Sequence, residues 1–208
     1  MDRAAFLARE LLRIEAVRLQ PNDPFTWASG IESPIYTDNR VALAYPEVRT
    51  AIRDGLAQLT KAYERIDAIV GVATAGIPHA ALVADRLGLP MAYVRSSAKK
   101  HGRQNRIEGR LSEGDRVIVI EDLVSTGGSS LEAVEALRAA GFTVLATLAI
   151  FTYGFDAAEA RFAKANCPLH TLSDYPTLIA EARQQNKISE QQLSSLSEWR
   201  TRTSAQLG

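Results

Sequence analysis

The sequence is poor in cysteine, in net charge and in long apolar runs, and each absence excludes a class of protein. A single cysteine, Cys167, offers no partner for a disulfide framework and no spacing typical of a metal site. Lysine plus arginine and aspartate plus glutamate number 24 each, and the resulting zero net charge argues against a general nucleic-acid or membrane coat. No apolar stretch reaches the roughly 18 residues of a membrane span. The charged N-terminus is not typical of a secretory signal, so we expect a soluble cytoplasmic protein.

What is present predicts one domain of the α/β class. The 208 residues, 46% of them hydrophobic, match the roughly 100–200 residues of a single domain and suffice for a sizeable core. Short apolar strands alternate with helices, which is typical of a parallel sheet flanked by helices. We expect strands at 68–72, 91–94, 117–120 and 142–151, short strands or an ordered loop within 25–40, and helices at 3–19, 46–62, 80–87, 130–140, 157–165 and within 174–199. We expect Cys167 to be a small buried side chain rather than a nucleophile.

One segment carries most of the functional prediction. The β-branched run Val117–Ile120 is followed by two acids, Glu121 and Asp122, and then by hydroxyl-bearing residues and glycines at 125–130. In open α/β sheets, ligands bind beyond the carboxyl ends of the strands. A turn at the start of a helix suits a phosphate, and carboxylates suit hydroxyls or a divalent cation, so a phosphorylated sugar satisfies both. The alternative is that the two acids only cap the next helix and that the glycines only form a turn.

The segment 121–129 resembles the phosphoribosyl-pyrophosphate signature of the type I phosphoribosyltransferases. The resemblance implies a parallel-sheet core flanked by helices (residues 46–175), with a small N-terminal hood (1–45) and C-terminal helices (176–208). It also implies that Glu121 and Asp122 hold the ribose hydroxyls, with Asp122 among the catalytic residues, and that the turn wraps the 5-phosphate. The donor-binding residues implied here are Glu121, Asp122, Leu123, Val124, Ser125, Thr126, Gly127, Gly128 and Ser129.

A cationic segment spans residues 95–106, with no acid before Glu108. Its positive or titratable side chains are Arg95, Lys99, Lys100, His101, Arg103 and Arg106. Polar residues break any apolar periodicity, so we expect an exposed loop. It could be a solvated charge run, or a nucleic-acid patch without the usual interleaved aromatics. The functional interpretation is a lid that brings cations to a leaving pyrophosphate.

This segment narrows the resemblance to the orotate phosphoribosyltransferases. The stretch 93–109 is similar to their catalytic loop, with matches at Arg95, Lys99, His101, Gly102, Asn105 and 107–109. The resemblance implies that Arg95, Lys99 and His101 bind phosphoribosyl pyrophosphate. Lys99 and His101, the expected catalytic pair, would reach pyrophosphate in the neighbouring subunit's site, so activity would require a homodimer. Ser96 and Ser97 stand where relatives often have one lysine.

Two other segments extend the resemblance. The small residues within 70–80 permit either close backbone approach to a polyanion or tight strand–helix packing, and the resemblance implies pyrophosphate contact near Thr74 and Ala75. We expect His79 in the same segment to be a packed or surface histidine. The stretch 25–40 resembles the family's hood, which implies that orotate binds between it and Ser125. Trp27 and Tyr36 could face a ligand or the core.

The implied reaction is transfer of ribose 5-phosphate from phosphoribosyl pyrophosphate to orotate, giving orotidine 5-monophosphate and pyrophosphate in pyrimidine (UMP) synthesis. Mg²⁺ is expected with the donor, without a named protein ligand, because it prefers phosphates, hydroxyls and waters. Two alternatives stay open: a regulator that senses the donor while binding nucleic acid, and a transferase for another base. Many such transferases have an arginine where this chain has residues 151–154, so the group that holds the orotate carboxylate is not predicted.

Overall fold

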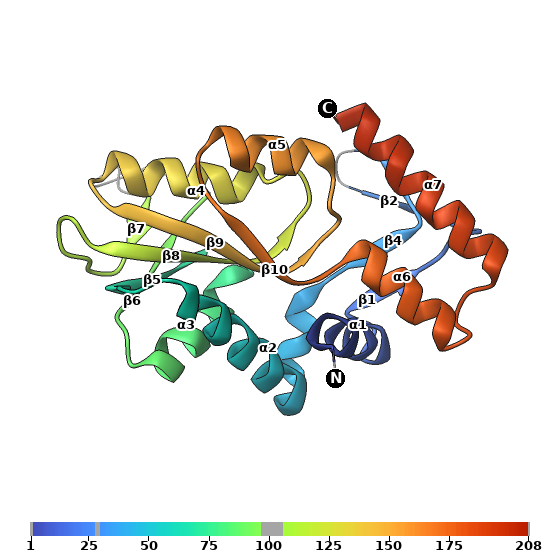
Figure 1. Ribbon diagram of the computed structural model, residues 1–208, viewed down its shortest axis with the longest axis horizontal. Helices are drawn as coiled ribbons and strands as arrows, with labels where there is room; N and C mark the ends of the chain where they lie inside the picture. The colour runs from blue at the N-terminus through green and yellow to red at the C-terminus, as the bar shows by residue number, and fades with distance from the viewer. Residues whose placement is uncertain (1, 28–29, 97–105, 208) are drawn as a thin grey trace.

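The computed structural model describes residues 2–27, 30–96 and 106–207. Its centre is a six-stranded sheet with helices on both faces (Figure 1). In spatial order the strands are β10 (Leu169–Asp174), β9 (Thr143–Thr152), β8 (Arg116–Val124), β5 (Ala68–Val72), β6 (Met91–Val94) and β7 (Ile107–Glu108). Neighbouring strands are parallel except β6 and β7, which are antiparallel. The predicted α/β fold with a parallel sheet is confirmed, with one antiparallel edge strand in addition.

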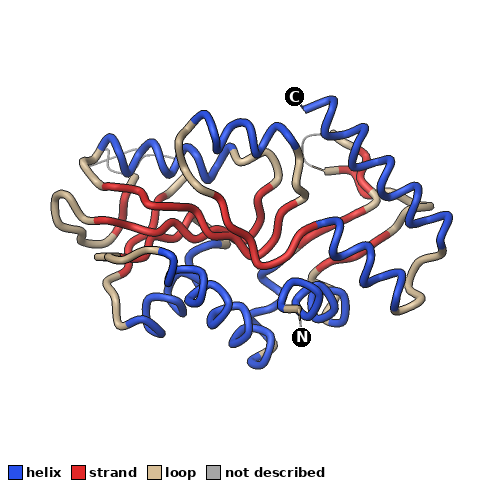
Figure 2. Tube along the Cα trace, in the orientation of Figure 1, coloured by secondary structure: helices blue, strands red, loops and turns tan. Residues whose placement is uncertain are grey.

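Helices cover both faces of the sheet, as Figure 2 shows. On one face lie α1 (Arg3–Arg13), α2 (Pro46–Leu59) and α3 (Gly76–Leu87), and on the other α4 (Gly128–Ala139) and α5 (Asp156–Lys164). Alternate residues of β8 serve the two cores: Ile118 and Ile120 pack in the cluster with α2 and α3, and Val117 and Val119 in the cluster with α4. This is the burial on both faces that the continuous β-branched run predicts.

The N-terminal segment differs from the predicted helix over 3–19. Helix α1 ends at Arg13, and Glu15 takes a φ of +57°, a left-handed backbone conformation that helices do not continue through. The chain resumes as β1 (Val17–Leu19), antiparallel to β4 (Ile35–Thr37). A second antiparallel pair, β2 (Phe25–Thr26) and β3 (Glu32–Ser33), confirms short strands within 25–40.

Several boundaries of the core differ from the prediction. Strand β8 continues to Val124 because Leu123 and Val124 still pair with β9, so Glu121 and Asp122 lie inside the strand rather than after it. Strand β10 was not predicted. Helix α3 begins at Gly76 rather than Ala80, and α4 begins at Gly128. The remaining helices are η1 (Asn39–Ala44), η2 (Thr60–Ala62), α6 (Tyr175–Gln184) and α7 (Glu190–Leu207).

Two expectations from composition can be compared with the structure. Cys167 is 3% exposed, so the buried side chain that was predicted is observed. Within the described ranges, no helix combines the length and the hydropathy that a membrane span needs.

Candidate functional site

The acids Glu121 and Asp122, which we call the acid pair, lie near the carboxyl end of β8, in the middle of the sheet. Gly76, the first residue of α3, packs against the backbone that leads into them. A Cβ at Gly76 would lie 2.5 Å from the carbonyl oxygen of Ile120, which is closer than any side chain can approach. At this position the small residues of the β5–α3 connection therefore serve tight packing, and the start of α3 is held against the acid pair.

Glu121 is turned inward and is only 4% exposed. Its Oε2 accepts hydrogen bonds from the hydroxyls of Ser130 at 2.9 Å and Ser129 at 3.3 Å, and its Oε1 accepts from the N–H of Asp122 at 3.2 Å. Burial, followed by the neighbouring Asp122 carboxylate, raises the pKa of Glu121 to about 8. Through the two serines this acid ties β8 to the first turn of α4, which agrees with the helix-capping alternative for this one residue.

Asp122 is less enclosed and lies where the N-terminal segment meets the sheet. Burial raises the pKa of Asp122, and the Arg40 guanidinium acts in the opposite direction. The Asp122 carbonyl accepts a hydrogen bond of 2.8 Å from Nδ2 of Asn39, in the first turn of η1. Asn39 is fully buried, and its Oδ1 has no hydrogen-bond partner among the described residues. The acid pair therefore faces two different surroundings, with Glu121 committed to α4 and Asp122 joined to η1.

The turn after β8 has a backbone that requires glycine. Gly127 takes a φ of +78°, and a Cβ there would lie 2.8 Å from the ring of Phe162. Ser125 and Thr126 are half-buried, whereas Gly128 and Ser129 are exposed at the start of α4. The unpaired N–H groups at the start of a helix and these hydroxyls are suited to an anion such as a phosphate.

The first two residues of the predicted donor-binding turn serve the base of the site. Leu123 packs against the hydrophobic core, and Val124 is buried. The Val124 carbonyl accepts hydrogen bonds from the Thr152 hydroxyl at 3.0 Å and from the Tyr153 N–H at 3.2 Å. Their side chains thus lie in the core, so only their backbone groups can contact a ligand.

Arg95 and Arg106 hold the two ends of the cationic segment together. The Arg95 N–H donates to the Arg106 carbonyl at 2.8 Å, and Nε of Arg106 donates to the Arg95 carbonyl at 3.0 Å. Arg106 also forms an ion pair of 3.1 Å with Glu132 of α4. A cavity of about 30 Å³ lies at this junction, and its lining includes Arg95 and Ser129, two predicted donor-binding residues. Residues 97–105 of the predicted exposed loop, which include Lys99 and His101, lie outside the described residues.

The β5–α3 connection contains a cis peptide bond between Ala73 and Thr74. His79, in the first turns of α3, is 1% exposed, so the packed histidine is observed rather than a surface one. Burial lowers the pKa of His79 to about 4, and within the described part of the chain its Nε2 has no hydrogen-bond partner. This histidine is therefore neutral in the folded protein at physiological pH.

The aromatic residues of the N-terminal segment divide between core and surface. Trp27 stacks on Tyr153 with ring centroids 5.1 Å apart, and its Nε1–H donates to the Ile35 carbonyl at 3.1 Å, so Trp27 belongs to the core. Tyr36 is 37% exposed, and the Arg18 guanidinium lies 5.0 Å from its ring centroid. Tyr36 is therefore the ring of the two that a ligand can reach.

Four residues near Asp122 were not among the predicted site residues: Thr37, Asn39, Arg40 and Tyr153. The Tyr153 hydroxyl donates to Oγ1 of Thr37 at 3.1 Å, which joins the end of β9 to the end of β4. Tyr153 is 2% exposed, and burial raises its pKa to about 12. The signal available in the sequence was the polar run of residues 38–40, placed directly after a short strand.

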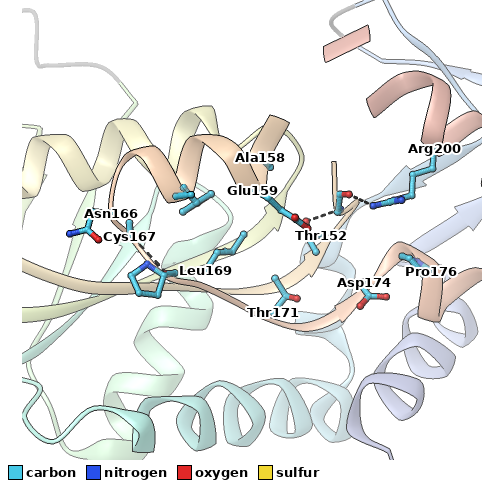
Figure 3. Close-up of a pocket in the computed structure, with 14 residues that line it drawn as sticks. Thr152, Ala158, Glu159, Asn166, Cys167, Leu169, Thr171, Asp174, Pro176 and Arg200 are labelled. Atoms are coloured by element: carbon cyan, nitrogen blue, oxygen red, sulfur yellow. Dashed lines mark hydrogen bonds between the residues drawn. The ribbon is translucent and has the colours of Figure 1, made fainter. Parts of the chain in front are cut away.

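A larger cavity, of about 570 Å³, lies beside β10 and contains none of the predicted site residues (Figure 3). Several polar groups around it are already used by the fold. The Thr152 hydroxyl donates to Val124, Arg200 of α7 donates to the carbonyls of Tyr153 and Gly154, and Asp174 caps α6. Its size alone does not make it a site, and we place the candidate site at the acid pair.

Comparisons with known proteins show which family the chain resembles. A family model described as the phosphoribosyl transferase domain matches residues 43–176. An orotate phosphoribosyltransferase of Staphylococcus saprophyticus is 58% identical over 198 residues, 95% of this chain and 98% of the relative. The structure of orotate phosphoribosyltransferase from Aeropyrum pernix matches with a TM-score of 0.76 and 31% identity, over 88% of this chain and 99% of that one. The Mycobacterium tuberculosis enzyme in complex with 5-phospho-α-D-ribosyl 1-diphosphate matches with a TM-score of 0.67 and 27% identity, over 86% and 99%.

Proposed function

The chain belongs to the phosphoribosyltransferase family and, within it, to the orotate phosphoribosyltransferases, and from this premise we propose that its reaction site lies at the end of β8. The reaction transfers ribose 5-phosphate from phosphoribosyl pyrophosphate to N1 of orotate, giving orotidine 5-monophosphate and pyrophosphate in pyrimidine biosynthesis. One observation supports the location above all: the acid pair, the glycine turn into α4 and the base of the cationic segment meet at one end of the sheet.

We assign the donor to the β8–α4 turn. The hydroxyls of Ser125 and Thr126 and the first N–H groups of α4 would hold the 5-phosphate, helped by the positive end of the helix. Asp122 would accept hydrogen bonds from the ribose hydroxyls. Glu121 would contribute indirectly, through Ser129 and Ser130, since the hydroxyls of both serines already donate to it.

Orotate is an anion with a nucleophilic nitrogen, so positioning and charge stabilisation would supply most of the rate. We propose that Ser125 contacts orotate, which would lie between the hood (residues 1–45) and the core (46–175). The C-terminal helices (176–208) would form the third part of the same domain. We also propose a cytoplasmic location, which suits a protein whose single cysteine is buried and unpaired.

Departure of pyrophosphate builds negative charge that cations must stabilise. Arg95 lies at the base of the cationic segment and lines the same small cavity as Ser129. By family resemblance, Lys99 and His101 would deliver the remaining positive charge, and they would do so in the partner's site of a homodimer. Closing the segment only after both substrates bind would keep water from the reacting carbon.

Mg²⁺ is proposed as the companion of the donor, and the residues present fit such a role. Among the described residues, no cluster of three or more His, Cys, Asp or Glu side chains could form a cage for a metal ion. A cation held by one or two carboxylates and the substrate's own oxygens needs no such cage. Asp122 is the carboxylate best placed to share it. When bound, Mg²⁺ would neutralise charge on the pyrophosphate.

The proposed function is tested by offering orotate, uracil, adenine and hypoxanthine separately with Mg²⁺ and phosphoribosyl pyrophosphate, and following base absorbance and pyrophosphate release. We expect orotate to be used with a kcat/KM at least about 100-fold above the others, because the proposed site would recognise an anionic pyrimidine. Preferential use of a purine, or no use of orotate, would contradict the proposal.

A variant pair tests the location. Asp122→Asn removes the charged acceptor and should lower kcat/KM by about 10- to 100-fold. Glu159→Gln, which changes an acid in the larger cavity beside β10, serves as the control and should retain wild-type turnover. The reverse pattern would move the site to that cavity.

A further inference from the structure

Orotate carries a carboxylate, and a site that binds it beside Asp122 needs a positively charged group that attracts this carboxylate. The end of β9 does not supply one. Tyr153 stands there with a neutral hydroxyl that is committed to Thr37, and the rest of its side chain is packed between Trp27 and Phe155. The opposite wall of the site, where β4 passes into η1, is the other place to look for a cation.

Arg40 is a cation on that side, and two observations place it near Asp122. The preceding residue, Asn39, donates from Nδ2 to the carbonyl of Asp122 at 2.8 Å. This hydrogen bond holds the backbone next to Arg40 against the acid pair. The guanidinium also acts electrostatically on the Asp122 carboxyl. The side chain is 61% exposed, so a ligand at Asp122 can reach it.

The guanidinium is held in one orientation by Asp38. Its Nε donates to Oδ1 at 2.7 Å and its Nη2 donates to Oδ2 at 2.9 Å, and Oδ1 also accepts from the Arg40 N–H at 3.1 Å. This pairing uses the side edge of the planar group. The end edge, formed by Nη1 and the second hydrogen of Nη2, keeps the paired N–H geometry that binds a carboxylate with two parallel hydrogen bonds.

We propose that Arg40 binds the carboxylate of orotate through the end edge of its guanidinium, with Asp38 as the residue that positions it. The inference rests on the function proposed above, because it names how that site recognises its acceptor base. Arg40 is then a specificity-determining residue. It selects orotate from pyrimidines that lack the carboxylate.

Steady-state kinetics of Arg40→Gln and Arg40→Lys test this inference in the full-length protein. With saturating phosphoribosyl pyrophosphate, Arg40→Gln should lower kcat/KM for orotate by about 10- to 100-fold, mainly through KM, because charge-assisted hydrogen bonds to the substrate are lost. The kcat/KM for uracil and the KM for the donor should stay within about twofold of wild type. Arg40→Lys, which keeps the charge without the fork, should fall between the two.

Arg18→Gln is the matched control, since it removes another exposed cation of the same segment, one that stacks on Tyr36 and Phe25. It should leave the orotate-to-uracil ratio unchanged. Thermal melting of each variant establishes that it is folded. If Arg40→Gln keeps the wild-type KM for orotate, or changes only the KM for the donor, the inference is wrong while the proposed function stands. If the wild-type protein does not use orotate at all, the proposed function itself fails.

Discussion

A buried carboxyl group whose pKa lies above neutrality makes the folded state sensitive to pH, and Glu121 is such a group. Its pKa is about 8 in the folded protein, against an ordinary value of 4.5 in the unfolded chain. The folded state therefore holds this proton over a pH range in which the unfolded state has released it. The contribution of Glu121 to stability is fully present below pH 4.5 and is lost as the pH rises towards 8.

Glu121→Gln should remove this dependence, because a glutamine keeps an acceptor for Ser129 and Ser130 without a charge. Relative to wild type, the variant should gain stability steadily between pH 4.5 and 8, on the order of 5 kcal/mol, or roughly 10 to 20 degrees in Tm. Differential scanning calorimetry at several pH values measures it. Melting curves that run parallel over this range would contradict the prediction.

His79 has the opposite effect on the pH dependence of stability, and the comparison of wild type with Glu121→Gln cancels it. Because burial lowers its pKa from 6.5 to about 4, the protein loses stability as the pH falls through that interval. His79 is present in both wild type and Glu121→Gln. The difference between the two melting temperatures therefore isolates Glu121 from the histidine.

Residue types could be predicted from the sequence better than their orientations. The sequence predicted both members of the acid pair as site residues. It did not indicate that Glu121 would point to Ser129 and Ser130 while Asp122 joined η1. These orientations depend on hydroxyls eight and nine residues further on and on Asn39, far earlier in the chain. Arg40 was missed for the same reason, since its relevance arises only where η1 meets β8.

At the scale of elements, α3 lies so close to β8 that Gly76 has no room for a side chain. Gly76→Ala would place a Cβ against the Ile120 carbonyl, and the clash cannot be relieved by a change of rotamer, because the carbonyl belongs to the backbone and the Cβ is fixed to Cα. We expect a loss of about 1–3 kcal/mol in the free energy of unfolding. We also expect kcat/KM for orotate to fall under conditions in which the variant is still folded, because the displaced strand carries the acid pair. Denaturant titration and kcat/KM for orotate measure the two effects.

Gly128→Ala is the matched control for stability. A Cβ at Gly128 meets nothing within 4 Å, and the residue begins α4 without a left-handed backbone. Its stability should be unchanged or slightly raised. Equal losses in both variants would show that the close contact at Gly76 is not the cause.

Elements with a strong local pattern were predictable, and those stabilised by distant contacts were not. The continuous β-branched run of β8, and the helices α3 and α4 that end shortly before Gly88 and Gly141, follow from the sequence. Strand β10 has a mixed burial pattern and pairs with one neighbour only, so its periodicity is weak. β1 continues the apolar spacing of α1, and it becomes a strand because β4, distant in sequence, supplies its hydrogen bonds.

At the scale of the whole molecule, the proposed dimer makes a quantitative prediction about mixed subunits. Lys99→Ala removes the cation supplied by the loop, and Asp122→Asn disables the pocket. If each loop serves the partner's pocket, a mixed dimer pairs the intact loop of the Asp122→Asn subunit with the intact pocket of the Lys99→Ala subunit. One site of the two then combines an intact loop with an intact pocket, whereas neither parent homodimer contains such a site.

Random reassociation of equal amounts gives mixed dimers as about half of the population, so about one quarter of wild-type activity should return. Each variant put through the same dissociation and reassociation alone is the control, and sedimentation measures the oligomeric state before and after. A mixture no more active than its parents, although dimers have exchanged, would place Lys99 in the site of its own subunit. A protein that sediments as an active monomer would refute the shared site altogether, because a loop that must cross between subunits cannot work alone.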